Sequence, residues 1–454
     1  MKYAIGLDIG IASVGYAVLA FDYDENPWGI IRLGSRIFDK AENPKDGASL
    51  ALPRRLARGA RRRLRRRKHR IERIKNLLVQ SNIITTEQLE HLYDGELSDV
   101  FGLRVKALDK KLTSEELARV LLHLAHRRGF KSNRKADAKD KEAGELLNAV
   151  SENEKRMQNN NYRTVGEMFY KDEFFAIHKR NKAGKYLSTV ARSMIENEAK
   201  QILQTQFMLG NFAITDVFVT KYMDILLSQR QFDEGPGEPS PYAGNQIENM
   251  IGKCIFEPEE YRAAKASYSF EYFNLLQKVN HIRLLVDGVV QPLSDEQRKK
   301  IIDLALTKAD LKYAAIRKTL GLGDKVRFNS IFYSEDDVDS AEKKAKFNFL
   351  PIYHQLRKAF EALGKNYIAK FDVMTLDEIG RVLATYKGDA KRMEMLSLAG
   401  LDNEECDAVL GISGVSKFGH LSLKALRKIN PFFEQGMIYS DACTAAGYNF
   451  RAHY

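Results

Sequence analysis

The chain has 454 residues, with 72 Lys and Arg against 60 Asp and Glu, which gives a formal net charge of +12 and a pI of about 9.3. Because 44% of the residues are hydrophobic, the composition excludes a wholly disordered chain, and the length allows roughly three domains. The three cysteines, Cys254, Cys406 and Cys443, lie too far apart for a CxxC zinc motif or a disulfide framework. Their scarcity indicates a reducing environment such as the cytosol.

The first fifty residues are rich in strand formers and carry a carboxylate at a suggestive position. Weakly alternating apolar and polar residues, bounded by turn residues, predict strands over residues 2–9, 14–21 and 30–38. The first two of these strands are predicted to form a β-hairpin. Asp8 falls at the end of the first predicted strand, beside a glycine turn. A carboxylate in that position can bind a divalent cation or a metal-bound phosphate.

Three interpretations of Asp8 stay open on this short pattern. The carboxylate could cap the turn through backbone N–H groups. It could be the metal-bridging residue of an RNase H-like nuclease, or the turn could cradle phosphate in an actin-like or sugar-kinase-like ATPase. The ATPase interpretation needs a second Asp-Gly phosphate turn and a Gly-rich adenosine site, and we identify neither in the sequence.

The excess positive charge is concentrated in one segment. Residues 54–75 hold eleven Arg, two Lys and one Glu, so this segment alone carries a net charge equal to the +12 of the whole chain. Apolar residues at positions 56, 60, 64, 71, 74 and 78 predict a helix with one apolar seam that docks on the protein, and Pro53 suits its first position. Arginines this dense repel one another unless a polyanion neutralises them. The segment therefore predicts contact with a nucleic acid rather than a solvated face or a localisation signal.

The rest of the chain is predicted to be mostly helical, with no sheet after residue 50. Residues 136–161 are polar and are predicted to be mobile, and the Pro- and Gly-rich stretch 234–244 predicts an internal boundary or an ordered loop that contacts a ligand. Gly129 is predicted to terminate the helix that starts after Thr113. Capping boxes predict helix starts at Thr85 with Gln88, Thr113 with Glu116, Ser294 with Gln297, and Thr375 with Glu378.

The sequence gives only weak indications of a metal site or of base-stacking aromatic residues. His123 and His126 have the spacing of two metal ligands on one helix face, but no third ligand is evident in the sequence. Tyr268, Phe270 and Tyr272 lie near Lys265 and could stack on bases, although a place in the hydrophobic core is the favoured interpretation.

Several stretches along the whole chain resemble the RNA-guided DNA endonuclease of type II CRISPR systems, most closely its compact II-C forms. The arginine-rich stretch makes the resemblance specific. The matching stretches are IGLDIGIASVGYAV at 5–18, RIFDKAENP at 36–44, SLALPRRLARGARRRLRRRKHR at 49–70, LARVLLHLAHRRGFKSNRK at 117–135, YRTVGEM at 162–168, HKRNK at 178–182, GKCIFEPEEYRAAKASYSFE at 252–271 and SKFGHLSLKALRKI at 416–429.

This resemblance implies a mainly α fold. Residues 1–50 resemble the first segment of a split RuvC-like nuclease domain, a three-strand fragment of an RNase H-like α/β fold. Residues 51–80 resemble the arginine-rich bridge helix, and residues 81–234 and 235–454 resemble two parts of an α-helical recognition lobe. Asp8 would be the catalytic, metal-binding carboxylate. The implied RNA-binding residues are Arg54, Arg55, Arg58, Arg61, Arg62, Arg63, Arg65, Arg66, Arg67, Lys68, Arg70, Arg73, Arg127, Arg128, Lys131, His178, Lys179 and Arg180.

The function implied is that of the N-terminal portion of a CRISPR effector in a prokaryotic cytoplasm. Such a protein binds a guide RNA (crRNA with tracrRNA) and the guide–target heteroduplex, and when complete it cleaves target DNA with Mg²⁺ or Mn²⁺. Further nuclease segments and a PAM-reading domain are expected as partners outside these 454 residues, and a monomer without membrane association is expected. The chain alone is therefore expected to bind RNA without cleaving. A stand-alone RNA-binding or regulatory module is the alternative, and an actin-like ATPase the less favoured one.

Overall fold

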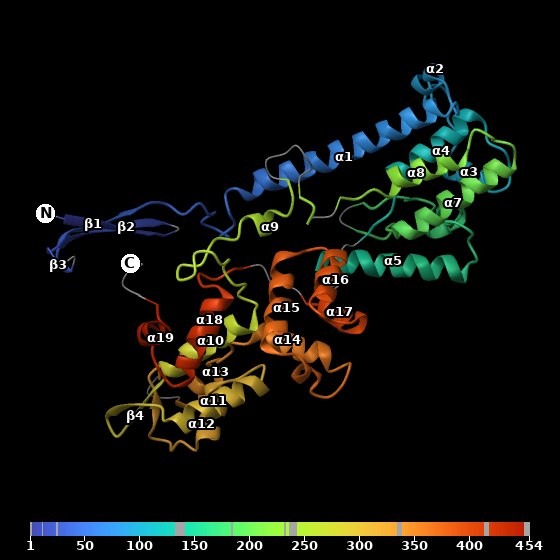
Figure 1. Cartoon of the computed structure of the whole chain (residues 1–454). Helices are drawn as coiled ribbons and strands as arrows, with labels where there is room; N and C mark the ends of the chain where they lie inside the picture. Colours follow the sequence, from blue (N-terminus) through green and yellow to red (C-terminus); the bar gives the residue numbers. More distant parts are fainter. Residues whose placement is uncertain are drawn as a thin grey trace. The chain divides into compact units, whose positions relative to one another are not determined.

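The computed structural model describes residues 2–10, 12–23, 26–131, 141–182, 185–230, 233–235, 243–333, 338–412 and 417–448. The chain divides into two compact units, each interrupted in sequence. The first comprises Met1–Gly129, Tyr162–Ile177 and Arg192–Ser228, and the second comprises Phe130–Asn161, His178–Ala191 and Gln229–Tyr454. The predicted mainly α class is confirmed (Figure 1). The four functional segments suggested by the resemblance divide the chain differently and stay a prediction. Most of the stretch 234–244 lies outside the described residues.

The first unit begins with an antiparallel sheet in the order β1-β2-β3, formed by Lys2–Ile9, Ser13–Phe21 and Pro27–Ile37. The predicted hairpin and third strand are therefore confirmed to within a few residues. The helices of this unit are α1 (Leu52–Gln80), α2 (Thr86–Glu90), α3 (Val100–Lys106), α4 (Ser114–His126), α6 (Val165–Lys171), α7 (Arg192–Met208) and α8 (Asp216–Leu227), with a short 3-10 helix, η2, at Glu173–Phe175.

The long helix α1 is confirmed, but its apolar seam docks on the protein over only part of its length. Ile71, Ile74 and Leu78 are buried in the C-terminal part, where α1 contacts α4 and α8. Leu56 and Leu64 in the N-terminal part are 63% and 65% exposed, which corrects the prediction of a continuous docked seam. Pro53 occupies the second helical position rather than the first. Proline is tolerated there as well, because the first four N–H groups of a helix have no intrahelical acceptor and the missing N–H of Pro53 breaks no hydrogen bond.

The second unit is built mainly of helices packed around three buried apolar clusters. Its longer helices are α5 (Lys141–Asn159), α10 (Tyr268–Asn280), α11 (Asp295–Thr307), α14 (Pro351–Phe360), α15 (Val373–Thr385), α16 (Asp389–Leu398) and α18 (Leu423–Glu434). Shorter ones are α9 (Gln246–Asn249), α12 (Tyr313–Leu320), α13 (Val338–Lys344), η3 (Tyr367–Lys370), α17 (Asn403–Leu410) and α19 (Tyr439–Ala445).

The prediction that no sheet follows residue 50 is wrong. A small antiparallel sheet in the order β5-β4-β6 is formed by Val289–Pro292, Arg283–Val286 and Arg327–Phe328. Asp287 and Gly288 connect β4 to β5 with φ of 48° and 83°, the positive values that a two-residue hairpin turn requires. The Asp-Gly pair between two apolar runs was the available sequence signal for this hairpin.

Two further predictions need correction. Residues 141–159 form the helix α5, because one face of this polar segment is held inward, where buried Asn153 donates to the carbonyls of Leu187 and Thr189 at 2.9 and 2.8 Å. Three of the four capping boxes are confirmed, but α15 is capped by Asp372, whose carboxylate accepts from the Thr375 N–H at 2.8 Å. The helix α4 ends at His126, and Gly129, with φ of 77°, follows three residues later.

Within the described ranges, no helix combines the length and apolar character that a membrane span requires.

Candidate nucleic-acid interface

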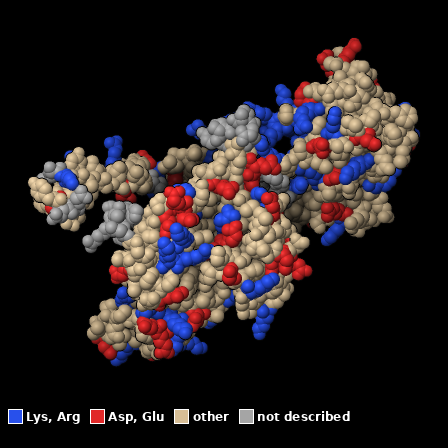
Figure 2. Space-filling view, viewed as in Figure 1, with Lys and Arg blue, Asp and Glu red and all other residues tan. Residues whose placement is uncertain are grey.

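Over most of its length, α1 presents basic side chains, nearly all of them arginines, to solvent. Arg54, Arg55, Arg58, Arg61, Arg62, Arg63, Arg65, Arg66, Arg67, Lys68 and Arg73 are all exposed. Among the residues that the structure describes, none of these side chains forms an ion pair with a carboxylate. Figure 2 shows blue basic side chains gathered where α1 runs in Figure 1. The face is therefore a concentration of cations without internal neutralisation.

Five of these residues form one straight row, which we call the basic stripe: Arg54, Arg58, Arg61, Arg65 and Lys68. Their spacing of four, three, four and three residues keeps them on one side of a helix. Successive members rise by about 5 Å along the helix axis. The stripe therefore offers a regular line of guanidinium and ammonium groups to an extended polyanion.

Toward the C-terminal part of α1, the arginines are held by backbone carbonyls and a histidine instead of carboxylates. Arg67 Nε donates to His126 Nδ1 at 3.2 Å, and Arg70 Nε donates to the carbonyl of Ala125 at 3.1 Å. Arg128 donates through Nη1 to the carbonyls of Leu226, at 3.2 Å, and Ser228, at the end of α8. These contacts fix the orientation of the side chains without cancelling their charge.

Arg70, Arg128 and Arg192 form a group that we call the arginine cluster. Burial, followed by the charges of Arg128 and Arg67, lowers the pKa of Arg70 to about 10. Burial, followed by the charges of Arg128 and Arg70, lowers the pKa of Arg192 to about 10, and burial also lowers the pKa of Arg128. Three mutually repelling guanidinium groups in a partly desolvated position favour a bound anion such as phosphate.

Arg192 was not among the residues singled out from the sequence. It is the first residue of α7, it is 9% exposed, and its Nη2 lies 3.5 Å from the carbonyl of Gly129. A cation at a helix N-terminus is repelled by the positive end of the helix dipole. The position of Arg192 therefore disfavours its positive charge in addition to burial and the charges of Arg128 and Arg70. No local pattern marks it, because its neighbours in the cluster are distant in sequence.

The remaining predicted RNA-binding residues are distributed over both units. Arg127 is half-buried at the end of α4, in the first unit. Lys131, His178, Lys179 and Arg180 belong to the second unit, where all but the half-buried Lys179 are exposed. Next to Arg180, the Asn181 side chain donates to Thr189 Oγ1 at 2.9 Å and accepts from the Ser188 N–H at 2.8 Å. Each of these side chains reaches solvent, and their RNA-binding roles stay predictions.

Asp8 is exposed on one face of the N-terminal sheet. Antiparallel register sets Asp8 opposite Gly15, and Gly15 opposite Ser35, so only small side chains flank the carboxylate in its row. No three His, Cys, Asp or Glu side chains in the described part of the chain come together as a metal site.

The two histidines of α4 do not form a pair of metal ligands. His123 faces Arg104 and Phe101, while His126 accepts a hydrogen bond from Arg67.

The aromatic residues near Lys265 have structural roles, as favoured from the sequence. Phe270 is buried, and Tyr268 stacks on Tyr272 with ring centroids 5.6 Å apart while also contacting Tyr353. Their surfaces are thus largely used within the protein. A different aromatic residue, Phe349, faces the open pocket in this region.

Comparison with known proteins supports the resemblance seen in the sequence. The family model described as the Cas9 alpha-helical lobe domain matches residues 245–359. The CRISPR-associated endonuclease Cas9 of Campylobacter jejuni is 30% identical over 98% of this chain and 42% of its own length. The CRISPR-associated endonuclease Cas9 1 of Streptococcus thermophilus is 32% identical over 84% of this chain and 33% of its own length. The chain thus spans less than half the length of these curated relatives.

Solved structures agree with the sequence relatives. The crystal structure of Campylobacter jejuni Cas9 in complex with sgRNA and target DNA matches 99% of this chain and 54% of that chain, with a TM-score of 0.55 and 26% identity. A crystal structure of Streptococcus thermophilus Cas9 in complex with the GGAA PAM covers 98% of this chain and 41% of that chain, with a TM-score of 0.56 and 25% identity.

Proposed function

We propose that this chain, which resembles the N-terminal part of the Cas9 endonucleases along nearly its whole length, binds a guide RNA through the arginine face of α1. The observation that carries the proposal is the exposed, unneutralised row of cations on α1, continued at its C-terminal part by the arginine cluster. Arginine binds phosphate through paired N–H groups, and a helix of such residues follows a nucleic-acid backbone without reading its sequence. Guide RNA, rather than any polyanion, is favoured by the relatives' complexes with sgRNA.

The salt dependence of RNA affinity tests this proposal. If about eight phosphates are contacted, the logarithm of the association constant should fall with the logarithm of salt concentration at a slope of about −6 to −7. Replacing Arg58, Arg61 and Arg65 together by Gln should weaken binding at least about tenfold and make the slope shallower by about 2 to 3. Fluorescence anisotropy with a labelled guide RNA measures both quantities.

A charge-matched control separates the stripe from general basicity. Lys308, Lys318 and Lys365 are exposed in the second unit, and replacing all three by Gln removes the same charge. This control should leave affinity and slope nearly unchanged. A slope near −1 for the unaltered chain, or an equal loss in both triple variants, would contradict binding along α1.

The chain is further proposed to hold the guide–target heteroduplex and to contribute to cleavage of target DNA as part of a longer protein in a prokaryotic cytoplasm. Cleavage would proceed by metal-dependent hydrolysis of a phosphodiester bond, with Asp8 as one ligand of Mg²⁺ or Mn²⁺. A two-metal centre needs several carboxylates, and the described residues bring no such group together around Asp8. They do not fit the metal centre by themselves, so we assign no hydrolytic step to residues 1–454 alone.

The alternative of a stand-alone RNA-binding module is not favoured, because the relatives that match most of this chain are named CRISPR-associated endonucleases. The two candidates differ in what happens when further carboxylate-bearing nuclease segments are supplied as a second polypeptide. A nuclease portion should then support cleavage of guide-matched DNA, whereas a stand-alone module should not. The actin-like ATPase interpretation instead requires ATP binding that is lost in Asp8→Ala, which equilibrium dialysis with ATP would reveal.

A further inference from the structure

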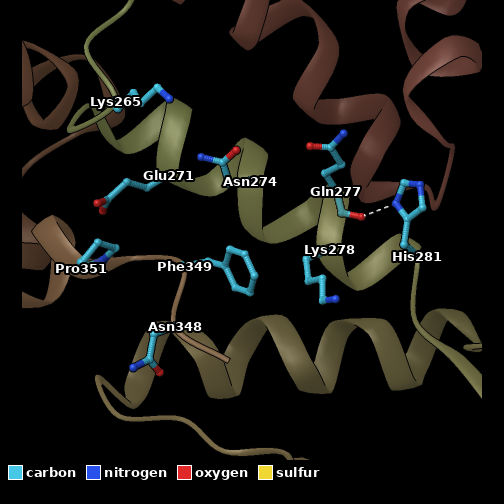
Figure 3. A pocket seen from close by; sticks show the side chains of 9 residues that line it. All are labelled: Lys265, Glu271, Asn274, Gln277, Lys278, His281, Asn348, Phe349 and Pro351. Atoms are coloured by element: carbon cyan, nitrogen blue, oxygen red, sulfur yellow. Dashed lines mark hydrogen bonds between the residues drawn. The ribbon is translucent and has the colours of Figure 1, made fainter. Parts of the chain in front are cut away.

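The second unit contains an open pocket of about 580 Å³ whose chemistry the α1 face does not explain. One wall is the outer side of α10, where Asn274, Gln277 and Lys278 follow one another at helical spacing. The opposite wall is the segment from Asn348 to Pro351, which leads into α14. Figure 3 shows the ring of Phe349 projecting into this space, with Lys265 and His281 near opposite ends.

The wall that carries Phe349 is fixed in place by hydrogen bonds and ring packing. Buried Glu271 of α10 accepts from the backbone N–H groups of Ile352 and Tyr353 at 2.9 and 3.0 Å, which ties the start of α14 to α10. Asn348 accepts from the Leu311 N–H at 3.0 Å. The Phe349 ring meets the buried Phe347 ring edge-on at 5.0 Å. The half-buried Phe349 is therefore a preorganised aromatic surface, not a mobile side chain.

The polar side chains opposite Phe349 have unused hydrogen-bonding capacity. Within the described residues, the side chains of Asn274, Gln277 and Lys278 form no hydrogen bond or ion pair. The carboxylate of Glu271 is taken up by two backbone N–H groups and points away from the Phe349 ring in Figure 3. The open part of the pocket thus combines an aromatic face, neutral amides and lysine ammonium groups, with little negative charge.

This combination suits a nucleobase on its sugar-phosphate backbone. An aromatic ring stacks on any base, amides bond to the base edges, and ammonium groups attract the neighbouring phosphates. The volume lies in the range of pockets that hold a small organic group, roughly 300 to 1,000 Å³. A base reaches such a recess only when it is unpaired and turned out of a helix, because paired bases expose only their edges.

We propose that this pocket binds one unpaired nucleobase of the RNA, which stacks on Phe349 and hydrogen-bonds to Asn274, while Lys265 and Lys278 contact the flanking phosphates. The inference rests on the proposed RNA-binding function and adds to it a second, base-contacting site in the other unit. It assigns to this unit recognition of an unpaired position, whereas the arginine face of α1 follows the backbone alone.

The test compares three ligands on the full chain: a short unstructured RNA, the same strand paired with its complement, and a ribose-phosphate oligomer of equal length without bases. Phe349→Leu keeps an apolar side chain but removes the stacking surface, and Asn274→Ala removes the amide. Each should weaken binding of the unstructured RNA, by about tenfold for Phe349→Leu, and leave the other two affinities unchanged. Phe332→Leu, at an aromatic residue that is 91% exposed outside the pocket, is the matched control.

A second readout identifies the site directly. An unstructured RNA carrying 5-iodouridine should photocrosslink to the peptide containing Phe349, and Asn274→Ala should reduce the yield. Equal affinity losses on all three ligands, or no loss in either variant together with no crosslink at Phe349, would overturn the base pocket. Failure of the RNA-binding function itself looks different, because then the unaltered chain would bind none of the three ligands with a steep salt dependence.

Discussion

Arg192 illustrates how a single residue can be unfavourable for the free protein yet useful for a ligand. Its charge is opposed by burial, by Arg128 and Arg70, and by its position at the start of α7. A phosphate bound among the three arginines, as the proposed function requires, would relieve this opposition. Among single residues, Arg192 therefore has the electrostatic environment that most directly supports the proposed RNA binding.

We expect Arg192→Gln to weaken guide RNA binding by about 3- to 10-fold and to reduce the magnitude of the salt slope by about 1, as for the loss of one phosphate contact. The melting temperature of the free protein should change little, because the substitution removes a repelling charge and also the Nη2 contact with the Gly129 carbonyl, and these two losses act in opposite directions. Anisotropy titrations and thermal unfolding measure the two effects. Lys200→Gln, on the exposed side of the same helix, is the control, and a comparable loss of affinity there would argue against the cluster.

Glu271 predicts a pH dependence of stability with a definite sign. Burial raises its pKa to about 8 from an ordinary value of 4.5, although the N–H groups of Tyr353 and Ile352 act in the opposite direction. The folded protein therefore binds this proton more tightly than the unfolded chain does, so the contribution of Glu271 to stability is largest below pH 4.5 and declines as the pH rises toward 8.

Thermal unfolding of the unaltered protein and Glu271→Gln at several pH values between 5 and 8.5 checks this sign. The melting temperature of the unaltered protein relative to that of the variant should decrease as the pH rises. Glu257→Gln serves as the contrast, because Lys424, Lys428 and Tyr448 lower the pKa of Glu257 to about 2 and shift its effect below this range. A pH-independent difference for Glu271→Gln would refute the assignment.

At the scale of elements, α3, α6 and α7 are joined by one buried ion pair. Arg104 and Glu198 are each 1% exposed and meet through two hydrogen bonds of 2.6 Å, and Glu198 also accepts from the Gly166 N–H at 2.9 Å. A Cβ on Gly166 would lie 2.5 Å from Glu198 Oε1 and 2.8 Å from Arg104 Nε. Glycine is therefore required here by close approach rather than by backbone conformation.

Gly166→Ala should destabilise the protein by about 1–3 kcal/mol, because the ion pair has no space into which it can move. Chemical denaturation monitored by circular dichroism measures this change. Gly323→Ala is the matched control, since a Cβ there meets nothing within 4 Å and should leave stability nearly unchanged. Equal stability of Gly166→Ala and the unaltered protein would show that the pair rearranges at little cost.

Element boundaries were predictable where local chemistry determines them. The strands of the N-terminal sheet, the arginine-rich helix and three capping boxes follow from alternation, helical periodicity and side-chain caps. The errors have two causes. Tertiary contacts decide α5, which is polar yet held inward through Asn153. The β4–β5 hairpin has a local signal in Asp287 and Gly288, but its strands of four residues each are too short to show a clear alternation. The apolar seam of α1 was visible, but only packing against α4 and α8 selects the half that is buried.

For the molecule as a whole, RNA binding and DNA cleavage should be separable. Residues 1–454 with guide RNA, guide-matched DNA and Mg²⁺ should bind RNA without cutting DNA, since Asp8 is one carboxylate where a two-metal centre needs several. Asp8→Ala should leave RNA affinity nearly unchanged, because the side chain is not part of the arginine face. A cleavage assay on gels, run beside the binding titrations, tests both statements. Robust cutting by these residues alone would contradict the proposed role of Asp8.

The sequence by itself determined the mainly helical class, the family resemblance and the location of the charge, because composition, periodicity and motif spacing are local properties. The body outside residues 54–75 is electrically balanced, so the +12 marks one helix. Only the tertiary structure revealed that Arg192 joins Arg70 and Arg128, and that Phe349 faces Asn274 across a pocket. These groups are brought together by packing between segments far apart in the chain, and no local pattern encodes which distant side chains will meet.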